Sequence, residues 1–133
     1  MVEKKDVKRI LEEVKHDFSF LENKVLAVLL YGSAQKDEHH EKSDIDICIV
    51  APKQEPKKIL KEVFRKIDVY GKKYDVRVFE EMPLYIKIEV IRNHTLVFGS
   101  VHELYEYFYF FRKLWEEQKH RQKVTKEDLL KSL

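Results

Sequence analysis

Hydrophobic residues recur at helical spacing in several stretches of the chain. Between residues 3 and 18, apolar side chains come every three or four positions with charged ones between them, which predicts an amphipathic helix. The same spacing predicts a helix over 57–68 and a longer one over 101–119. We expect a short last helix over 126–132, with Thr125 as its cap.

Other stretches show the pattern of strands. Residues 25–31 form a continuous apolar run typical of a buried strand, whereas residues 44–50 (DIDICIV) alternate polar and apolar side chains. Alternation also predicts a strand over 74–79, and 95–98 reads as a short strand. Residues 84–92 leave two alternatives open, because their β-branched side chains favour a strand and the preceding proline suits a helix. Strands that alternate with helices predict an α/β or α+β fold.

Composition narrows the classes of protein. The 133 residues suit one domain, which we divide into residues 1–99 and a helical extension, 100–133, packed on it. The 26 basic and 24 acidic residues nearly cancel, which argues against stable binding of duplex nucleic acid. A single cysteine excludes an internal disulfide. The chain has neither a membrane-length apolar run nor an apolar leader, so we expect a cytoplasmic protein.

Two polar motifs flank the segment between the first two predicted strands. Gly32 and Ser33 follow the apolar run, where a glycine lets the backbone approach a phosphate and the serine hydroxyl adds a donor. Ten residues later come Asp44 and Asp46, whose side chains share one face of a strand. Two adjacent carboxylates repel each other and favour a bound cation, and their hard oxygen ligands select Mg²⁺ or Mn²⁺.

Asp75 stands on another alternating strand. If that strand lies beside 44–50, Asp75 completes a cluster of three carboxylates, which can hold two cations about 3.5–4 Å apart. Such a pair of cations serves phosphoryl and nucleotidyl transfer, and Asp75 is then a candidate general base for an attacking hydroxyl. Arg77 lies on the same face of that strand, where it either contacts phosphate or balances the acidic cluster.

This pattern of Gly-Ser, ten residues, Asp-x-Asp and a later strand aspartate resembles the polymerase-beta-type nucleotidyltransferase superfamily. Its small size and early motif resemble the minimal nucleotidyltransferases of archaea and bacteria. The resemblance implies a mixed β-sheet flanked by helices, two Mg²⁺ ions and a nucleoside triphosphate donor, usually ATP. The residues that match the motif are Gly32 and Ser33 as the phosphate-holding pair, Asp44 and Asp46 as the metal-binding pair, and Asp75 as the third carboxylate. Where the family often carries arginine, Lys36 supplies the positive charge.

The resemblance also implies a partner. Minimal nucleotidyltransferases are often encoded beside a HEPN-type toxin, and the implied function is an antitoxin that transfers AMP from ATP to a tyrosine of that toxin. An unusually aromatic segment at 103–115 suggests a surface for such a partner or for a homodimer. Two alternatives stay open: a catalytically weak module that binds a nucleotide or a partner, and a nucleotidyltransferase acting on small molecules.

Overall fold

The computed structural model describes residues 7–32 and 44–132. In that part of the chain, four strands form one sheet in the order β3-β2-β1-β4. The strands are β1 (Ala27–Tyr31), β2 (Ile45–Val50), β3 (Tyr74–Val78) and β4 (His94–Gly99). β1 pairs antiparallel with β2 and β4, whereas β2 and β3 run parallel. The sheet is therefore mixed, as predicted.

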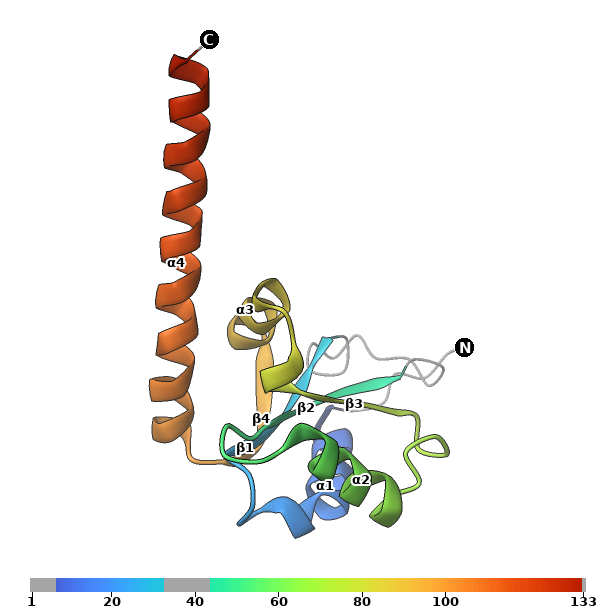
Figure 1. Cartoon of the computed structure of the whole chain (residues 1–133). Helices are drawn as coiled ribbons and strands as arrows, with labels where there is room; N and C mark the ends of the chain where they lie inside the picture. The colour runs from blue at the N-terminus through green and yellow to red at the C-terminus, as the bar shows by residue number, and fades with distance from the viewer. Residues whose placement is uncertain (1–6, 33–43, 133) are drawn as a thin grey trace.

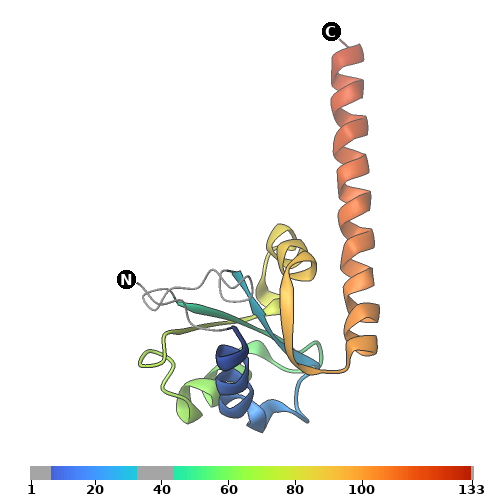
Figure 2. The same cartoon turned by 180° about the vertical axis from the view of Figure 1, so that it is seen from behind.

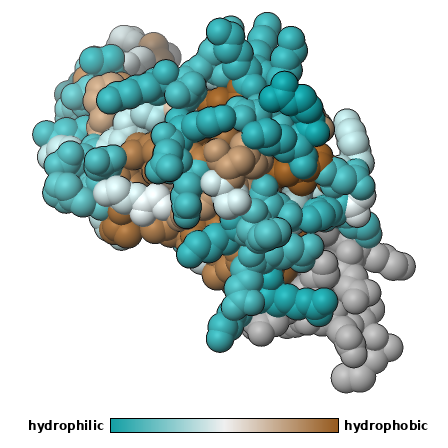
Figure 3. Space-filling model, turned by 90° about the horizontal axis from the view of Figure 1, so that it is seen from below, coloured by the Kyte–Doolittle hydropathy of each residue, from teal (hydrophilic) through white to brown (hydrophobic). Residues whose placement is uncertain are grey.

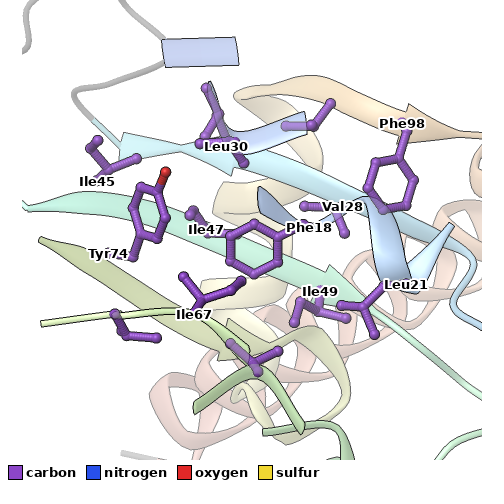
Figure 4. Close-up of a cluster of buried hydrophobic side chains, with 14 of the residues drawn as sticks. Phe18, Leu21, Val28, Leu30, Ile45, Ile47, Ile49, Ile67, Tyr74 and Phe98 are labelled. Atoms are coloured by element: carbon purple, nitrogen blue, oxygen red, sulfur yellow. The ribbon is translucent and has the colours of Figure 1, made fainter. Parts of the chain in front are cut away.

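Helices cover both faces of this sheet (Figures 1 and 2). On one face, α1 (Val7–Asp17) and α2 (Pro56–Lys66) bury apolar side chains against β1 and β2. Figure 4 shows this core, with Phe18 among side chains from the sheet such as Val28, Ile47 and Ile49. Phe18 and the three strand residues named with it have no exposed surface, so water does not reach the centre of this core.

The opposite face is covered by α3 (Leu84–Arg92) and α4 (Val101–Lys131). Residues 84–92, for which strand and helix were both open, form a helix that starts directly after Pro83. Glu80, in the short 3₁₀-helix Phe79–Glu81, accepts the backbone N–H of Ala51 at 2.9 Å and the hydroxyl of Tyr107 at 2.8 Å. This carboxylate ties the end of β2 to α4.

α4 is a single helix of 31 residues, so the prediction of two helices separated between 119 and 126 was wrong. Its start agrees with the sequence, because the Ser100 hydroxyl accepts the Glu103 N–H at 3.3 Å as an N-cap. Residues 119–125 contain neither glycine nor proline, so nothing interrupts the helix, and Thr125 lies within it instead of capping it. In both views the later part of α4 stands clear of the domain (Figures 1 and 2).

Figure 3 shows polar residues over most of the face seen from below, with smaller hydrophobic areas between them. No helix in the described ranges is long and apolar enough to span a bilayer. The division of the chain at residues 99 and 100 stays a prediction.

Candidate active site

A row of polar side chains crosses the sheet at the start of β2. Asp46 is paired with Tyr31 of β1 on one side and with Asp75 of β3 on the other. Directly paired residues share a face of the sheet, so these three side chains lie on the face that also carries α3 and α4. The condition set on Asp75 by the sequence is thus met, since β3 lies next to β2 and places the two aspartates in register.

The two aspartates act on each other electrostatically. Burial raises the pKa of the Asp46 carboxyl from 3.8 to about 6, and the negative charge of Asp75 is the next largest contribution. A side-chain hydrogen bond between Asp46 and Asp75 adds to this rise, and Arg77 opposes it. A half-buried pair of carboxylates needs a shared proton or a cation to balance it. The residues present therefore fit a divalent cation by charge and by ligand type.

Asp44 differs from this pair in its exposure and in its place on the chain. It precedes β2, is exposed, and contributes to the raised pKa of Asp46 only through its charge. Within residues 7–32 and 44–132, no three His, Cys, Asp or Glu side chains are grouped so that they could hold a metal ion. The grouping of Asp44 with Asp46 and Asp75 as a three-carboxylate centre remains a prediction.

Arg77 extends from β3 on the same face as Asp75. Its Nε lies 3.5 Å from Oδ1 of Asp75, and the two side chains are 61% and 37% exposed. The charge of Asp75 raises the pKa of the guanidinium. Arg77 therefore balances the acidic pair, which was one of its two expected roles, and an exposed ion pair of this kind contributes little to stability.

Gly32 is required by the geometry of this end of the sheet. Its φ of +68° lies in the left-handed region, and a side-chain carbon at this position would collide with the Asp46 carboxylate. The glycine thus lets the backbone that leaves β1 pass directly over Asp46. Ser33 and Lys36, the other two predicted nucleotide-binding residues, lie outside the described residues.

Sequence reasoning missed Tyr31. Burial is the main cause that raises the pKa of its hydroxyl, and the charge of Asp46 is the second. The pairing of β1 with β2 creates this contact, and the only local signal was the position of Tyr31 directly before Gly32. Cys48, two residues after Asp46, is fully buried as expected, and burial raises the pKa of its thiol.

Comparison with known proteins places the chain in a family. A family model described as "Nucleotidyltransferase domain" matches residues 7–97, which is more than half of the chain. A protein of Methanocaldococcus jannaschii named "Putative protein adenylyltransferase MJ1547" is 46% identical over 99 residues, which are 74% of this chain and 76% of that protein. A second protein of the same organism, "Putative protein adenylyltransferase MJ0141", is 28% identical over 74 residues, 55% of this chain and 75% of its own length.

Solved structures share the fold at low sequence identity. A chain from a toxin–antitoxin crystal structure with AMP-PNP superposes with a TM-score of 0.71, at 14% identity, over 90% of this chain and 98% of that one. A chain from a complex of tri-AMPylated Shewanella oneidensis HEPN toxin with MNT antitoxin gives a TM-score of 0.67, at 11% identity, over 94% and 99%. These likenesses show the fold. The family model and the relative of 46% identity carry the classification: this chain belongs to the nucleotidyltransferase domain family.

Proposed function

We propose that this chain is a metal-dependent protein adenylyltransferase that moves AMP from ATP to a tyrosine hydroxyl of a HEPN-type toxin. The observation that carries the proposal is the register of Asp46 with Asp75 beneath Gly32, in a chain of the nucleotidyltransferase domain family. Two in-register carboxylates beside a backbone that can approach phosphate are the parts that nucleotidyl transfer needs.

Each of these residues has a part in the proposed reaction. Gly32 and Ser33 hold the triphosphate of ATP, and Lys36 adds positive charge. Asp75 takes the proton of the acceptor hydroxyl as its oxygen attacks the α-phosphorus. The bond from the α-phosphorus to the bridging oxygen of the β-phosphate breaks, and pyrophosphate leaves. The products are the adenylylated hydroxyl and pyrophosphate.

Asp44, Asp46 and Asp75 would hold divalent cations, with Mg²⁺ preferred and Mn²⁺ accepted. When bound, these ions polarise the phosphate oxygens and neutralise developing charge. Our proposal of two ions rests on the family resemblance and on the ligand chemistry of the three carboxylates. Asp46 and Asp75 face each other across neighbouring strands, so a cation between them would relieve their repulsion.

Two observations support a protein acceptor. The relative that is 46% identical carries the name of a protein adenylyltransferase, and several structures of the same fold are toxin–antitoxin complexes. On the chain itself, Tyr105, Tyr109 and Phe110 of α4 are exposed beyond the face that packs on the domain. Exposed aromatic side chains on one helix are characteristic of protein interfaces. Adenylylation would add negative charge to the toxin and disfavour its binding to RNA.

The test is to co-express the chain with the product of the neighbouring gene and to measure the intact mass of that product. Transfer adds about 329 Da for each AMP, which is the mass of a covalently added nucleotidyl group. The matched control is Asp46→Asn, which keeps the shape of the side chain and removes its charge. We expect no mass gain with this variant. An unmodified partner with the wild-type chain would contradict the proposal and favour a small-molecule acceptor or a module that only binds.

A further inference from the structure

Next to Asp75, the sheet ends in a strand with one open side. β3 pairs with β2 alone, and in the described part of the chain no strand lies on its other side (Figure 1). The Ile45 N–H donates to the Lys73 carbonyl at 2.8 Å, which fixes the direction of the backbone groups along β3. Because these groups alternate in direction, the N–H and C=O of Val76 point away from β2.

A pocket of about 230 Å³ lies along this open side. Its apolar walls come from α2, β3 and the start of α3, and they include Leu60, Val76, Met82 and Ile86. Val78 and Pro83 also line it, as do two exposed charged residues, Arg77 and Glu81. We refer to the pocket that these eight residues line as the β3 pocket.

Arg77 connects the β3 pocket to the candidate active site. It lines the pocket and contacts Asp75 at 3.5 Å. Two residues along a strand span about 6.6 Å, so the pocket opens within one side-chain length of the proposed general base. A side chain in the pocket could therefore belong to the same short peptide segment as a hydroxyl placed at Asp75.

The size and charge of the β3 pocket argue against the nucleotide as its occupant. Sites for small ligands and cofactors usually enclose about 300–1,000 Å³, so this pocket suits one side chain better than a nucleoside. Its two charged residues have opposite signs, which gives no net positive charge to hold a triphosphate. An open strand edge offers main-chain hydrogen bonds that a polypeptide can complete and a nucleotide cannot.

We propose that the β3 pocket is the acceptor subsite of this enzyme. An extended segment of the acceptor protein adds alongside β3, presents its hydroxyl to Asp75, and inserts an apolar side chain one or two residues away into the pocket. Side chains alternate along such a segment, so a neighbour of the modified residue faces Val76 while the next one faces Arg77. This inference rests on the proposed function and adds how the acceptor is recognised.

The test places a charge inside the β3 pocket with the Ile86→Glu variant. The matched control is Tyr85→Glu on the same helix, where the side chain is 61% exposed and does not line the pocket. Transfer to the purified toxin partner gives KM, and calorimetry with Mg²⁺ and AMP-PNP gives the nucleotide Kd. We expect the acceptor KM of Ile86→Glu to rise by about 10–200-fold, the range for a lost apolar fit, with an unchanged Kd for AMP-PNP. Leu60→Glu, on the opposite wall, should behave alike, and Tyr85→Glu should match the wild type.

Three results would overturn the inference. A parallel loss of AMP-PNP affinity would make the pocket part of the nucleotide site. An unchanged acceptor KM in both pocket variants, with transfer by the wild type intact, would show that the pocket does not bind the acceptor. The proposed function would then stand without it. A wild-type chain that binds AMP-PNP but modifies no partner would overturn the proposed function, and the acceptor subsite with it. Circular dichroism checks the fold, and Ile86→Gln replaces Ile86→Glu should that variant fail to fold.

Discussion

The sheet face that carries α3 and α4 has two halves, and the helices cover one of them much more fully than the other. The candidate active site lies in the less covered half. At Cys48, the face is closed completely by side chains of α3 and α4. Two residues earlier on the same strand and face, Asp46 is only half-buried, as are its neighbours Tyr31 and Asp75. Burial raises the pKa of both Cys48 and Asp46, but only the acidic half keeps access to solvent and ligands.

The comparison teaches that the scaffold and the site are separable. The covered half is held by aromatic packing, in which Phe108 lies 5.1 Å from Phe79 and 5.7 Å from His94, ring centre to ring centre. In the acidic half, strand pairing positions the polar side chains, because β2 lies between β1 and β3 and brings one residue of each strand side by side. Changes in the first half should therefore cost stability, and changes in the second should cost activity.

The largest expected effect is a loss of turnover when a residue of the acidic half is replaced. Asp75→Asn removes the proposed base and should lower kcat about 10²–10⁴-fold, the usual contribution of general base catalysis. The Kd for Mg-AMP-PNP should change much less, since the role lies mainly in the chemical step. Single-turnover transfer and calorimetry measure the two quantities. Equal losses in both would instead assign Asp75 to nucleotide binding.

The covered half should respond in the opposite way. Phe108 is fully buried, so Phe108→Ala should lower the free energy of unfolding by about 3–5 kcal/mol. Tyr105→Ala, on an exposed face of the same helix, should change it by no more than about 0.5 kcal/mol. Urea unfolding measures both variants. If folded Phe108→Ala also lost its nucleotide affinity, the two halves would not be separable.

Local patterns in the sequence predicted the parts of the site, and long-range pairing assembled them. The period of two along 44–50 placed Asp46 on one face and Ile47 on the other, in the core, as the structure has them. The neighbour of β2 could not be deduced this way, because strand order depends on residues far apart in the chain. For the same reason the position of Tyr31 beside Asp46 was not foreseen.

Helix boundaries were less predictable where local signals compete. The predicted helix start at 101 is real and is capped by Ser100, which accepts the Glu103 N–H. Thr125, the other predicted cap, has Asp128 at the same spacing but lies inside an unbroken helix. A cap motif is effective only where the preceding backbone leaves the helical region, and nothing between 119 and 125 forces it to do so.

A smaller effect should appear in the pH dependence of stability. The pKa of Asp46 is about 6 in the folded chain against an ordinary 3.8, so the folded state binds this proton more tightly than the unfolded state. Stability contributed by the protonated form is therefore present below pH 3.8 and is lost as pH rises to about 6. This residue therefore adds a fall of the melting temperature with rising pH across this range. Thermal unfolding should show that this fall is smaller in Asp46→Asn than in the wild type. Identical slopes would mean that Asp46 titrates normally.

The smallest effect should come from the part of α4 that lies beyond the covered half of the sheet. The described residues after Trp115, from 116 to 132, are all exposed, so they bury no apolar surface against the domain. Truncation after Glu117 should therefore change the free energy of unfolding of the domain by no more than about 0.5 kcal/mol, while lowering the helical signal in circular dichroism. Urea unfolding of the truncated and full chains makes this comparison. A loss well above that value would show that the cover of the sheet extends along α4 past Trp115.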